Sequence, residues 1–431
     1  MNVVELVKAS LLPELKQNFD DIPITPEHFE EYVKIVELNL RVLFKFLSEQ
    51  PRDYWTSTEE KLEFDTYLIL LLCEVTASNT YHKISNEEMV RHANLLLNSH
   101  KPMEPEVEDK IFSYYQAKLE QNVWKTQYGA INGFLRYIEF RYSQENKMKM
   151  NWMNFCLAIG LRLRESVETV FKHISLKIFK ALLQFSEPSK IKDTNIHSVI
   201  YDAVYKDVHY MSSEEATTDI WTCLSICVKF YENIDSTNWS YVDDMIEVLM
   251  RNIPINANDL ISLSLLRSVT KLGYFFSTNC ADIERAIAVD FKNEKELDEC
   301  RSCCRNNNSR TTLRWAKSIL ELFVVESYKL LSKQDLCVQL LEEIHRCYMV
   351  YILAIPLSIV ELHLITFFEK FITVLMEVMV LNEKDEKIAQ LIKALLTTFL
   401  HHLQNSSCEI NEKLLCIQQS LLKLIKLDFF M

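Results

Sequence analysis

The chain has 431 residues, a formal net charge of −13 and only 4 glycines. The glycines lie too far apart to form the glycine-rich phosphate loop of a doubly wound nucleotide-binding fold. The acidic balance disfavours direct nucleic-acid binding, because a phosphate backbone would be repelled over most of such a surface. The composition therefore favours a protein whose partners are other proteins.

The cysteine content and the hydropathy pattern indicate the cellular compartment. There are 12 cysteines in a long chain, and the first residues carry a glutamate and a lysine inside their apolar run, unlike a secretory signal. The longest apolar runs, such as Tyr348 to Val360, fall short of the roughly 20 residues that cross a bilayer. We therefore predict a cytoplasmic and nuclear protein with reduced thiols, no disulfide framework and no membrane partner.

Helices are predicted from the first residue onward. Met1 to Gln17 reads as a helix, and Thr25-Pro26-Glu27 begins the next with a hydroxyl cap, a first-turn proline and a carboxylate near the positive helix end. His100 to Glu108, with two prolines and several acids, is the predicted boundary in the first half. The apolar face of the second helix recurs at steps of three and four residues, at Val33, Val36, Leu40, Leu43 and Phe44.

The stretch from Glu165 to Tyr210 predicts a helix, a short polar turn at Glu187-Pro188-Ser189-Lys190, and a second helix. Neither helix can bury its apolar face alone, so the pair needs a further neighbour. The apolar face comprises Val167, Val170, Phe171, Ile174, Ile178, Leu182 and Leu183 in the first helix, and Ile196, Val199, Ile200, Val204 and Val208 in the second.

The second half of the chain continues in the same pattern. Asp298 to Arg310 is a polar interruption with three consecutive asparagines, and we predict a boundary or a mobile loop there. Long helices follow, among them Leu357 to Leu381 and Asn382 to Leu403. The latter has the cleanest apolar stripe, formed by Ile388, Leu391, Ile392, Leu395, Leu396, Phe399 and Leu400.

The predicted fold is all-α, an irregular helical-repeat solenoid of the HEAT or armadillo kind. The pattern gives roughly 17 helices and no run of alternating hydrophobicity that would indicate a sheet. One globular core rarely grows beyond about 250–300 residues, so residues 1–431 are predicted to form one elongated solenoid. Within it we expect three sub-blocks: N-terminal helices over 1–104, central repeats over 105–297 and C-terminal helices over 298–431.

Few residues have the spacing of a catalytic or metal site. Cys300 and Cys303 have the two-residue gap of a zinc knuckle, but no second pair with matching spacing follows, so they are weak zinc candidates. The chain has no nucleotide loop, kinase motif, nucleophile elbow or His-Glu-x-x-His helix. We therefore predict no catalytic residues, no cofactor and no metal, and a protein that is not an enzyme.

A pattern of aromatic, glycine and leucine positions runs through the segment 124–204. It begins with Trp124-Lys125, Gly133-Phe134 and Trp152, and continues through a helix that ends in the pair Leu182-Leu183. The stretch Lys192 to Ile196 then leads into a second helix. In this region the chain resembles the Tti-two family, the second Tel-two-interacting subunit of the Triple-T co-chaperone complex. Asn195 stands where that family has a turn glycine, and asparagine tolerates the same left-handed backbone. The positions that carry the resemblance are Trp124, Gly133, Trp152, Lys172, Leu182, Leu183, Asp193, Thr194 and Asp202.

The resemblance implies a non-catalytic scaffold that binds the other two Triple-T subunits, the Tel-two and Tti-one type helical-repeat proteins. It also implies work with the heat-shock protein 90 machinery in stabilising phosphatidylinositol-3-kinase-related kinases, including the mTOR, ATM and ATR types. Two other readings stay open: a HEAT or armadillo cargo or transport adaptor, and an all-helical enzyme with a deep pocket. The sequence leaves open which surface binds a partner.

Overall fold

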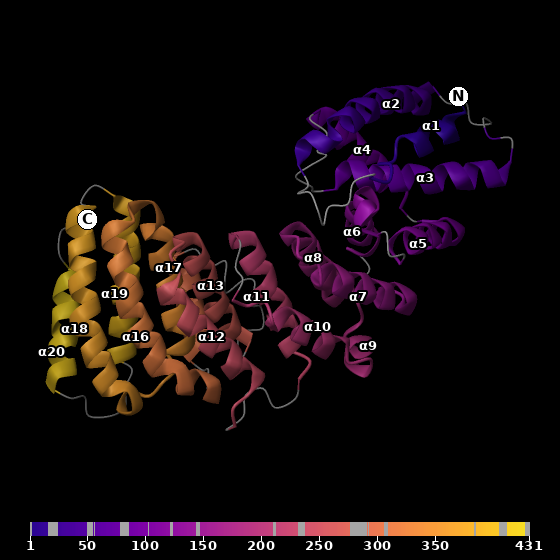
Figure 1. The fold of residues 1–431 in the computed structure, drawn as a ribbon. Coiled ribbons are helices and arrows are strands. Elements are labelled where there is room, and N and C mark those ends of the chain that lie inside the picture. The colour runs from indigo at the N-terminus through magenta and orange to yellow at the C-terminus, as the bar shows by residue number, and fades with distance from the viewer. Residues whose placement is uncertain are drawn as a thin grey trace. The chain divides into compact units, whose positions relative to one another are not determined.

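The computed structural model contains 19 α-helices, two short 3-10 helices and no strand within the residues that it describes (Figure 1). The predicted all-α, helical-repeat fold is therefore confirmed. No helix in these ranges is both long and apolar enough to span a membrane. The described residues are 2–15, 25–49, 55, 57–77, 86–101, 103–120, 124–143, 147–209, 213–231, 238–275, 291, 293–305, 309–382, 385–404 and 412–426.

Two compact units divide the chain, Met1–Ala203 and Val204–Met431. Their boundary falls within helix α10, Ile196–Tyr205. The sub-block limits expected after residues 104 and 297 both fall inside a unit. Glu104 is the N-cap of helix α5, which begins at Pro105. The second limit lies inside a helix of the second unit.

The first unit is built as two rows of helices that pack against each other. Helices α3, α6 and α8 follow one another in one row, while α5 and α7 form a second row beside α6 and α8, and α1 lies between α2 and α3. The elements are α1 Val3–Ala9, η1 Pro26–Phe29, α2 Glu30–Glu49, α3 Thr58–Thr76, α4 Glu87–Ser99, α5 Pro105–Leu119, η2 Trp124–Thr126, α6 Tyr128–Tyr142, α7 Met150–Arg164, α8 Thr169–Phe185 and α9 Pro188–Asp193.

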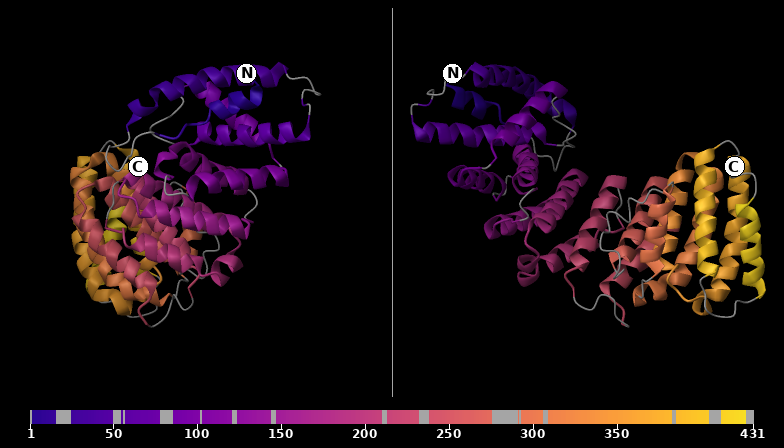
Figure 2. Two further views of the ribbon diagram at one scale, coloured as in Figure 1. Left: turned by 45° about the vertical axis from the view of Figure 1, so that its right-hand side comes forward. Right: turned by 180° about the vertical axis from the view of Figure 1, so that it is seen from behind.

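The second unit repeats this two-row arrangement. Helices α12, α16, α18 and α20 pack in sequence in one row, and α11, α13, α17 and α19 do so in the other. The last members of both rows lie side by side as near-parallel rods (Figure 2). The elements are α11 Glu214–Val228, α12 Tyr241–Ile255, α13 Asp259–Phe275, α15 Glu294–Arg305, α16 Arg310–Ser332, α17 Gln334–Tyr351, α18 Leu357–Leu381, α19 Glu386–Gln404 and α20 Glu412–Ile425.

The predicted hairpin over 165–210 is only partly right. Helix α8 forms and buries Phe171, but Pro188 begins helix α9 instead of ending a turn, because a proline needs no amide partner in the first helical turn. Val167 precedes α8 and is 90% exposed, and Val199 of α10 is 40% exposed, so the places of both valines on the apolar faces were wrong. Asn195 connects α9 to α10 with a φ of 56°, the left-handed backbone expected at that position.

The prediction of a loop over 298–310 was wrong for residues 298–305, which form most of α15. Arg301 is 2% exposed, with its Nε 2.9 Å from the Thr398 hydroxyl and its Nη2 3.2 Å from the Ala394 carbonyl. Its Nη1 lies 2.8 Å from the Asp298 carboxylate, one turn earlier in α15. A sequence that reads as solvated loop is therefore a helix whose central arginine is satisfied from α19.

Candidate functional site

The apolar positions that carry the resemblance lie in the core of the first unit. Trp152 on α7 is 1% exposed, and its ring centroid lies 4.8 Å from that of Phe112 on α5 and 5.2 Å from that of Tyr137 on α6. Trp124 on η2 packs against Phe171 on α8, with ring centroids 5.2 Å apart. Leu182 and Leu183 are also buried. These side chains hold α5 to α8 together.

The polar positions of the resemblance lie at helix ends or on the surface. The Thr194 hydroxyl donates to the Lys190 carbonyl at 2.6 Å and so closes the last turn of α9. Lys172 is half-buried, and its carbonyl accepts a hydrogen bond from Arg164 at 3.4 Å. Asp193 and Asp202 are exposed. Thr194 and the Lys172 carbonyl therefore take part in local helix contacts, and the described geometry assembles no catalytic group from these positions.

Gly133 belongs to a buried site that the sequence analysis missed. It faces Glu74, a glutamate of α3 that is 2% exposed, and a Cβ added at Gly133 would lie 3.0 Å from Glu74 Cγ. One turn earlier on α6, a Cβ at Gly129 would lie 3.0 Å from the Glu74 Oε1 atom and 2.6 Å from Leu12 Cβ. The two glycines thus leave the space into which the glutamate and the segment after α1 fit.

The Glu74 carboxyl has hydrogen bonds but no ion-pair partner within the described chain. The Leu12 amide donates to it at 2.9 Å, and the Tyr32 hydroxyl also hydrogen-bonds it. Burial raises the pKa of Glu74 to about 8, although the Leu12 amide, the distant Lys118 charge and Tyr32 oppose the rise. A glutamate inside the apolar run Leu68 to Val75, together with glycines four residues apart, is the signal that could have revealed this site.

Glu108 on α5 is a second buried carboxyl in the same unit, also 2% exposed. Lys149 Nζ lies 3.1 Å and Arg141 Nη2 3.3 Å from its oxygens, and the Tyr142 hydroxyl donates to it at 3.1 Å. Burial by itself would raise the pKa of Glu108, but the Lys149 hydrogen bond and the two positive charges outweigh it and lower the pKa. Glu108 therefore joins α5 to α6 and to the start of α7 as a charged group.

The core of the second unit contains a polar cluster centred on Thr398. Its hydroxyl oxygen accepts from Arg301 Nε at 2.9 Å and lies 3.0 Å from the Ala394 carbonyl and 2.6 Å from His345 Nε2. The other ring nitrogen of His345, Nδ1, is buried and has no hydrogen-bond partner in the described chain. Burial and the charges of Arg301 and Arg346 lower the pKa of His345, which is therefore neutral.

Asp243 on α12 is a buried acid of the second unit that joins two helices. It is 0% exposed and accepts from the Trp315 indole at 2.8 Å and from the Arg314 guanidinium, both on α16. The Ser240 amide donates to it at 2.9 Å from the turn before α12. The carboxylate thus caps its own helix and fixes the neighbouring one.

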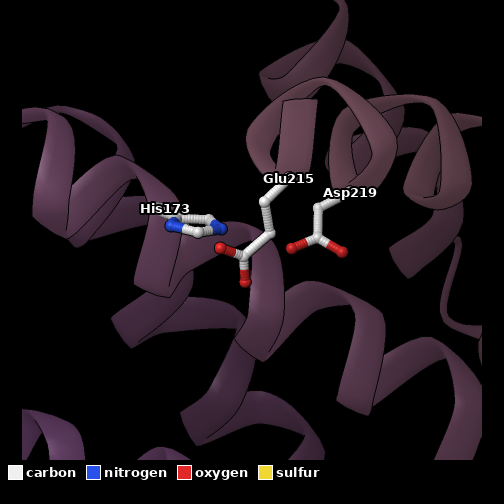
Figure 3. Close-up of side chains that lie close together, drawn as sticks. All are labelled: His173, Glu215 and Asp219. Carbon is white, nitrogen blue, oxygen red and sulfur yellow. The ribbon is translucent and has the colours of Figure 1, made fainter. Parts of the chain in front are cut away.

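Of the two zinc candidates, Cys300 belongs to no group of three metal-ligating side chains among the described residues. Cys300 is buried on α15, with its sulfur 3.8 Å from the Tyr274 hydroxyl. The side chain of Cys303 lies outside the described residues. Figure 3 draws Glu215 and Asp219, which project from successive turns of α11, and His173 of α8. Because α8 and α11 belong to different units, no group of three described metal-ligating side chains lies within either unit.

A surface cavity of about 300 Å³ lies along α4, and none of the buried acids lines it. It is lined by Glu88, Arg91, His92, Leu95, Leu96 and Ser99. The fold and its internal polar clusters define the class: an all-α helical-repeat protein whose described titratable clusters connect helices. No family model matches the chain, and no curated protein matches it.

Proposed function

We propose that this protein is a non-catalytic scaffold and co-chaperone subunit similar to the Tti-two component of the Triple-T complex. Its partners would be helical-repeat proteins of the Tel-two and Tti-one types, in the cytoplasm and nucleus. With the heat-shock protein 90 machinery, the assembly would support the maturation and stability of phosphatidylinositol-3-kinase-related kinases. The protein itself would carry no active site and would bind neither nucleic acid nor membrane.

The main support for the proposal is the backbone of the segment that resembles the family. Asn195 has a φ of 56°, and it occupies the place where the Tti-two family has a turn glycine. Left-handed backbone is uncommon outside glycine, so the residue type and the geometry agree at a position chosen from sequence alone. The neighbouring Leu182 and Leu183 pack in the core.

The helical-repeat architecture also suits a scaffold. Two rows of helices present long ridges and grooves on which helices of other proteins can lie. The buried acids Glu108 and Asp243 each have a cation and a further donor inside the fold. Side chains satisfied in this way stabilise helix packing and are not free to transfer protons to a substrate. For these two acids the observation favours a structural role.

The test is co-expression of the tagged, full-length chain with Tel-two and Tti-one type proteins, followed by affinity purification and size-exclusion chromatography with light scattering. We expect a stoichiometric ternary complex that survives moderate salt. Depleting the chain from cells should then lower the steady-state levels of the kinases without changing their transcripts. Recovery of the chain as a monomer, with neither subunit bound at low or high salt, would contradict the proposal.

The same purification separates the competing functions. A cargo or transport adaptor would bring down a soluble cargo segment without the two Triple-T subunits. An enzyme would turn over a substrate in the absence of any partner. Either result, combined with unchanged kinase levels on depletion, would replace the scaffold proposal.

A further inference from the structure

Helix α2 lies at the edge of the first unit, with α1 and α3 beneath it (Figure 1). Its inner face is firmly seated, because Val36, Leu40 and Leu43 are buried. The Asn39 amide donates to the Ser10 hydroxyl at 2.9 Å and fixes the helix to the end of α1. The helix is 20 residues long, so its outer side is a continuous surface of about five turns.

The outer side of α2 carries an apolar row. Ile35, Leu38 and Val42 are 47%, 63% and 52% exposed, and their spacing of three and four residues places them in line along the helix. The last layer of a helical-repeat array normally has a polar outer face, because no further repeat covers it. The apolar row on α2 instead resembles the face of an inner layer, on which another helix packs.

Charge marks one side of this row. Steps of about 100° per residue place Lys34, Arg41 and Lys45 together along the same edge of it. All three are exposed, and no described residue forms an ion pair with them. Glu31 and Glu49 stand at the two ends of the row, and Glu30 lies one turn before Lys34 at the start of the basic edge; all three glutamates are exposed. In a chain of net charge −13, three unpaired cations along one helix edge call for a complementary negative edge on whatever covers the row.

We propose that this α2 outer face, formed by Ile35, Leu38, Val42, Lys34, Arg41 and Lys45, binds an amphipathic helix of a partner protein. The partner helix has its own row of leucine-like side chains, with aspartate or glutamate along one side of it. Its leucine-like side chains pack against Ile35, Leu38 and Val42, and its acids lie next to the basic edge of α2. A bilayer is disfavoured because Glu31 and Glu49 would face anionic headgroups. A nucleic acid is disfavoured because the centre of the face is apolar.

This inference extends the scaffold proposal, and it rests on that proposal for the assumption that the chain has a protein partner. Its test uses no Triple-T subunit, so the two can fail independently. The probes are two stapled helical peptides of about 20 residues. Both carry leucines at helical spacing, and they differ only in having glutamates or lysines along one side of the leucine row. Each is labelled and titrated with the full-length chain by fluorescence anisotropy.

We expect the glutamate peptide to bind about tenfold or more tightly than the lysine peptide at low salt, with the preference shrinking as salt screens the charges. Leu38→Asp should weaken binding of the glutamate peptide about tenfold or more, because it puts a charge in the centre of the apolar row. The triple change Lys34→Glu, Arg41→Glu and Lys45→Glu should reverse the preference, so that the lysine peptide binds more tightly.

The matched control is Leu362→Asp on α18, where the leucine is 72% exposed in the other unit, and it should leave binding unchanged. Equal binding of both peptides, or loss of binding in the control as well, would overturn the proposal. So would a dimer, detected by light scattering, that Leu38→Asp dissociates, because a second copy would then cover the face. Binding to phosphatidylserine vesicles that the same variant abolishes would assign the face to a membrane instead.

Discussion

Glu74 on α3 and Glu108 on α5 are buried to the same extent, each 2% exposed, in the same unit. Burial raises the pKa of Glu74 to about 8, whereas the pKa of Glu108 is lowered in spite of its burial. The difference comes from the partners. Glu108 has Lys149 and Arg141 within 3.3 Å, while Glu74 has a backbone amide and a tyrosine hydroxyl. Opposite charge close by, together with how deeply the carboxyl is enclosed, decides which buried acid is ionised.

The two sites also make different use of helix packing. Glu74 fits where Gly129 and Gly133 let α6 approach α3, so its neutral carboxyl fills a close crossing and fixes Leu12 through a hydrogen bond. Glu108 lies on α5 where α6 and the start of α7 meet it. Its carboxylate forms ion pairs with Arg141 of α6 and with Lys149 at the start of α7. Because the two carboxyls lie in one unit, either can be changed with the other as an internal reference.

The largest effect is expected for Glu74→Gln. The pKa of Glu74 is higher in the fold than its usual 4.5, so its contribution to stability is fully present below pH about 4.5 and is lost as pH rises toward 8. Glutamine imitates the protonated acid and can still accept from the Leu12 amide. The variant should therefore raise the free energy of unfolding of the first unit by on the order of 3 kcal/mol at pH 7.

Hydrogen exchange of α3 and α6 peptides, followed across pH, measures this change without interference from the second unit. The wild type should lose protection between pH about 5 and 8, beyond the intrinsic pH dependence of exchange, and the variant should not. If both proteins lose protection in parallel over that range, Glu74 is not the titrating group.

Glu108→Gln should act in the opposite direction, lowering the free energy of unfolding by about 2 kcal/mol at neutral pH. The change leaves Arg141 and Lys149 without their carboxylate, and hydrogen bonds to charged groups contribute about 1.5–3 kcal/mol each. Because the pKa of Glu108 is lowered in the fold, its contribution is present above pH about 4.5 and is lost as pH falls below it.

Urea unfolding at neutral and acidic pH, monitored through α5 to α7, tests the Glu108 prediction. The gap between wild type and variant should close as the solution is acidified, since the wild-type carboxylate then becomes protonated. A gap that stays constant would indicate a packing defect instead of a lost charge.

Gly133→Ala tests whether the α3–α6 crossing depends on the missing side chain. The new Cβ would lie 3.0 Å from Glu74 Cγ and 3.3 Å from the Tyr115 hydroxyl, so these side chains must move by a few tenths of an ångström. We expect a net loss of about 1 kcal/mol, because the cost of overpacking exceeds the gain in helix propensity. In a Glu74→Ala background, which lacks Cγ, the same change should be neutral or stabilising, and thermal unfolding of the four proteins measures the coupling.

The smallest effect is expected for Lys149→Met. Lys149 is half exposed, so its ion pair with Glu108 is partly screened, and its loss should cost about 0.5 kcal/mol. The pKa of Glu108 should rise, which NMR titration of the side-chain carboxyl can measure. Lys147→Met is the matched control and should leave that pKa unchanged, since Lys147 forms no ion pair with Glu108.

The sequence predicted best where the signal was local. Helix α18 has the predicted bounds, Leu357–Leu381, and every member of the predicted stripe of α19 is buried. The start at Thr25-Pro26 is also confirmed, with the Thr25 amide bound by the His28 ring at 3.1 Å. Caps and apolar periodicity act over a few residues, so a single sequence contains all the information that fixes them.

The amino-acid sequence by itself determined the all-α class and most of the amphipathic faces, and it placed at position 195 a residue type that tolerates the left-handed backbone found there. The tertiary structure alone decided that the polar stretch around Arg301 is helical, because its partner Thr398 lies 97 residues away along the chain. It likewise decided the charge of Glu74 and Glu108, which depends on residues brought together by packing. Periodicity specifies which side of a helix is buried, but the neighbours that it meets there are set by the whole fold.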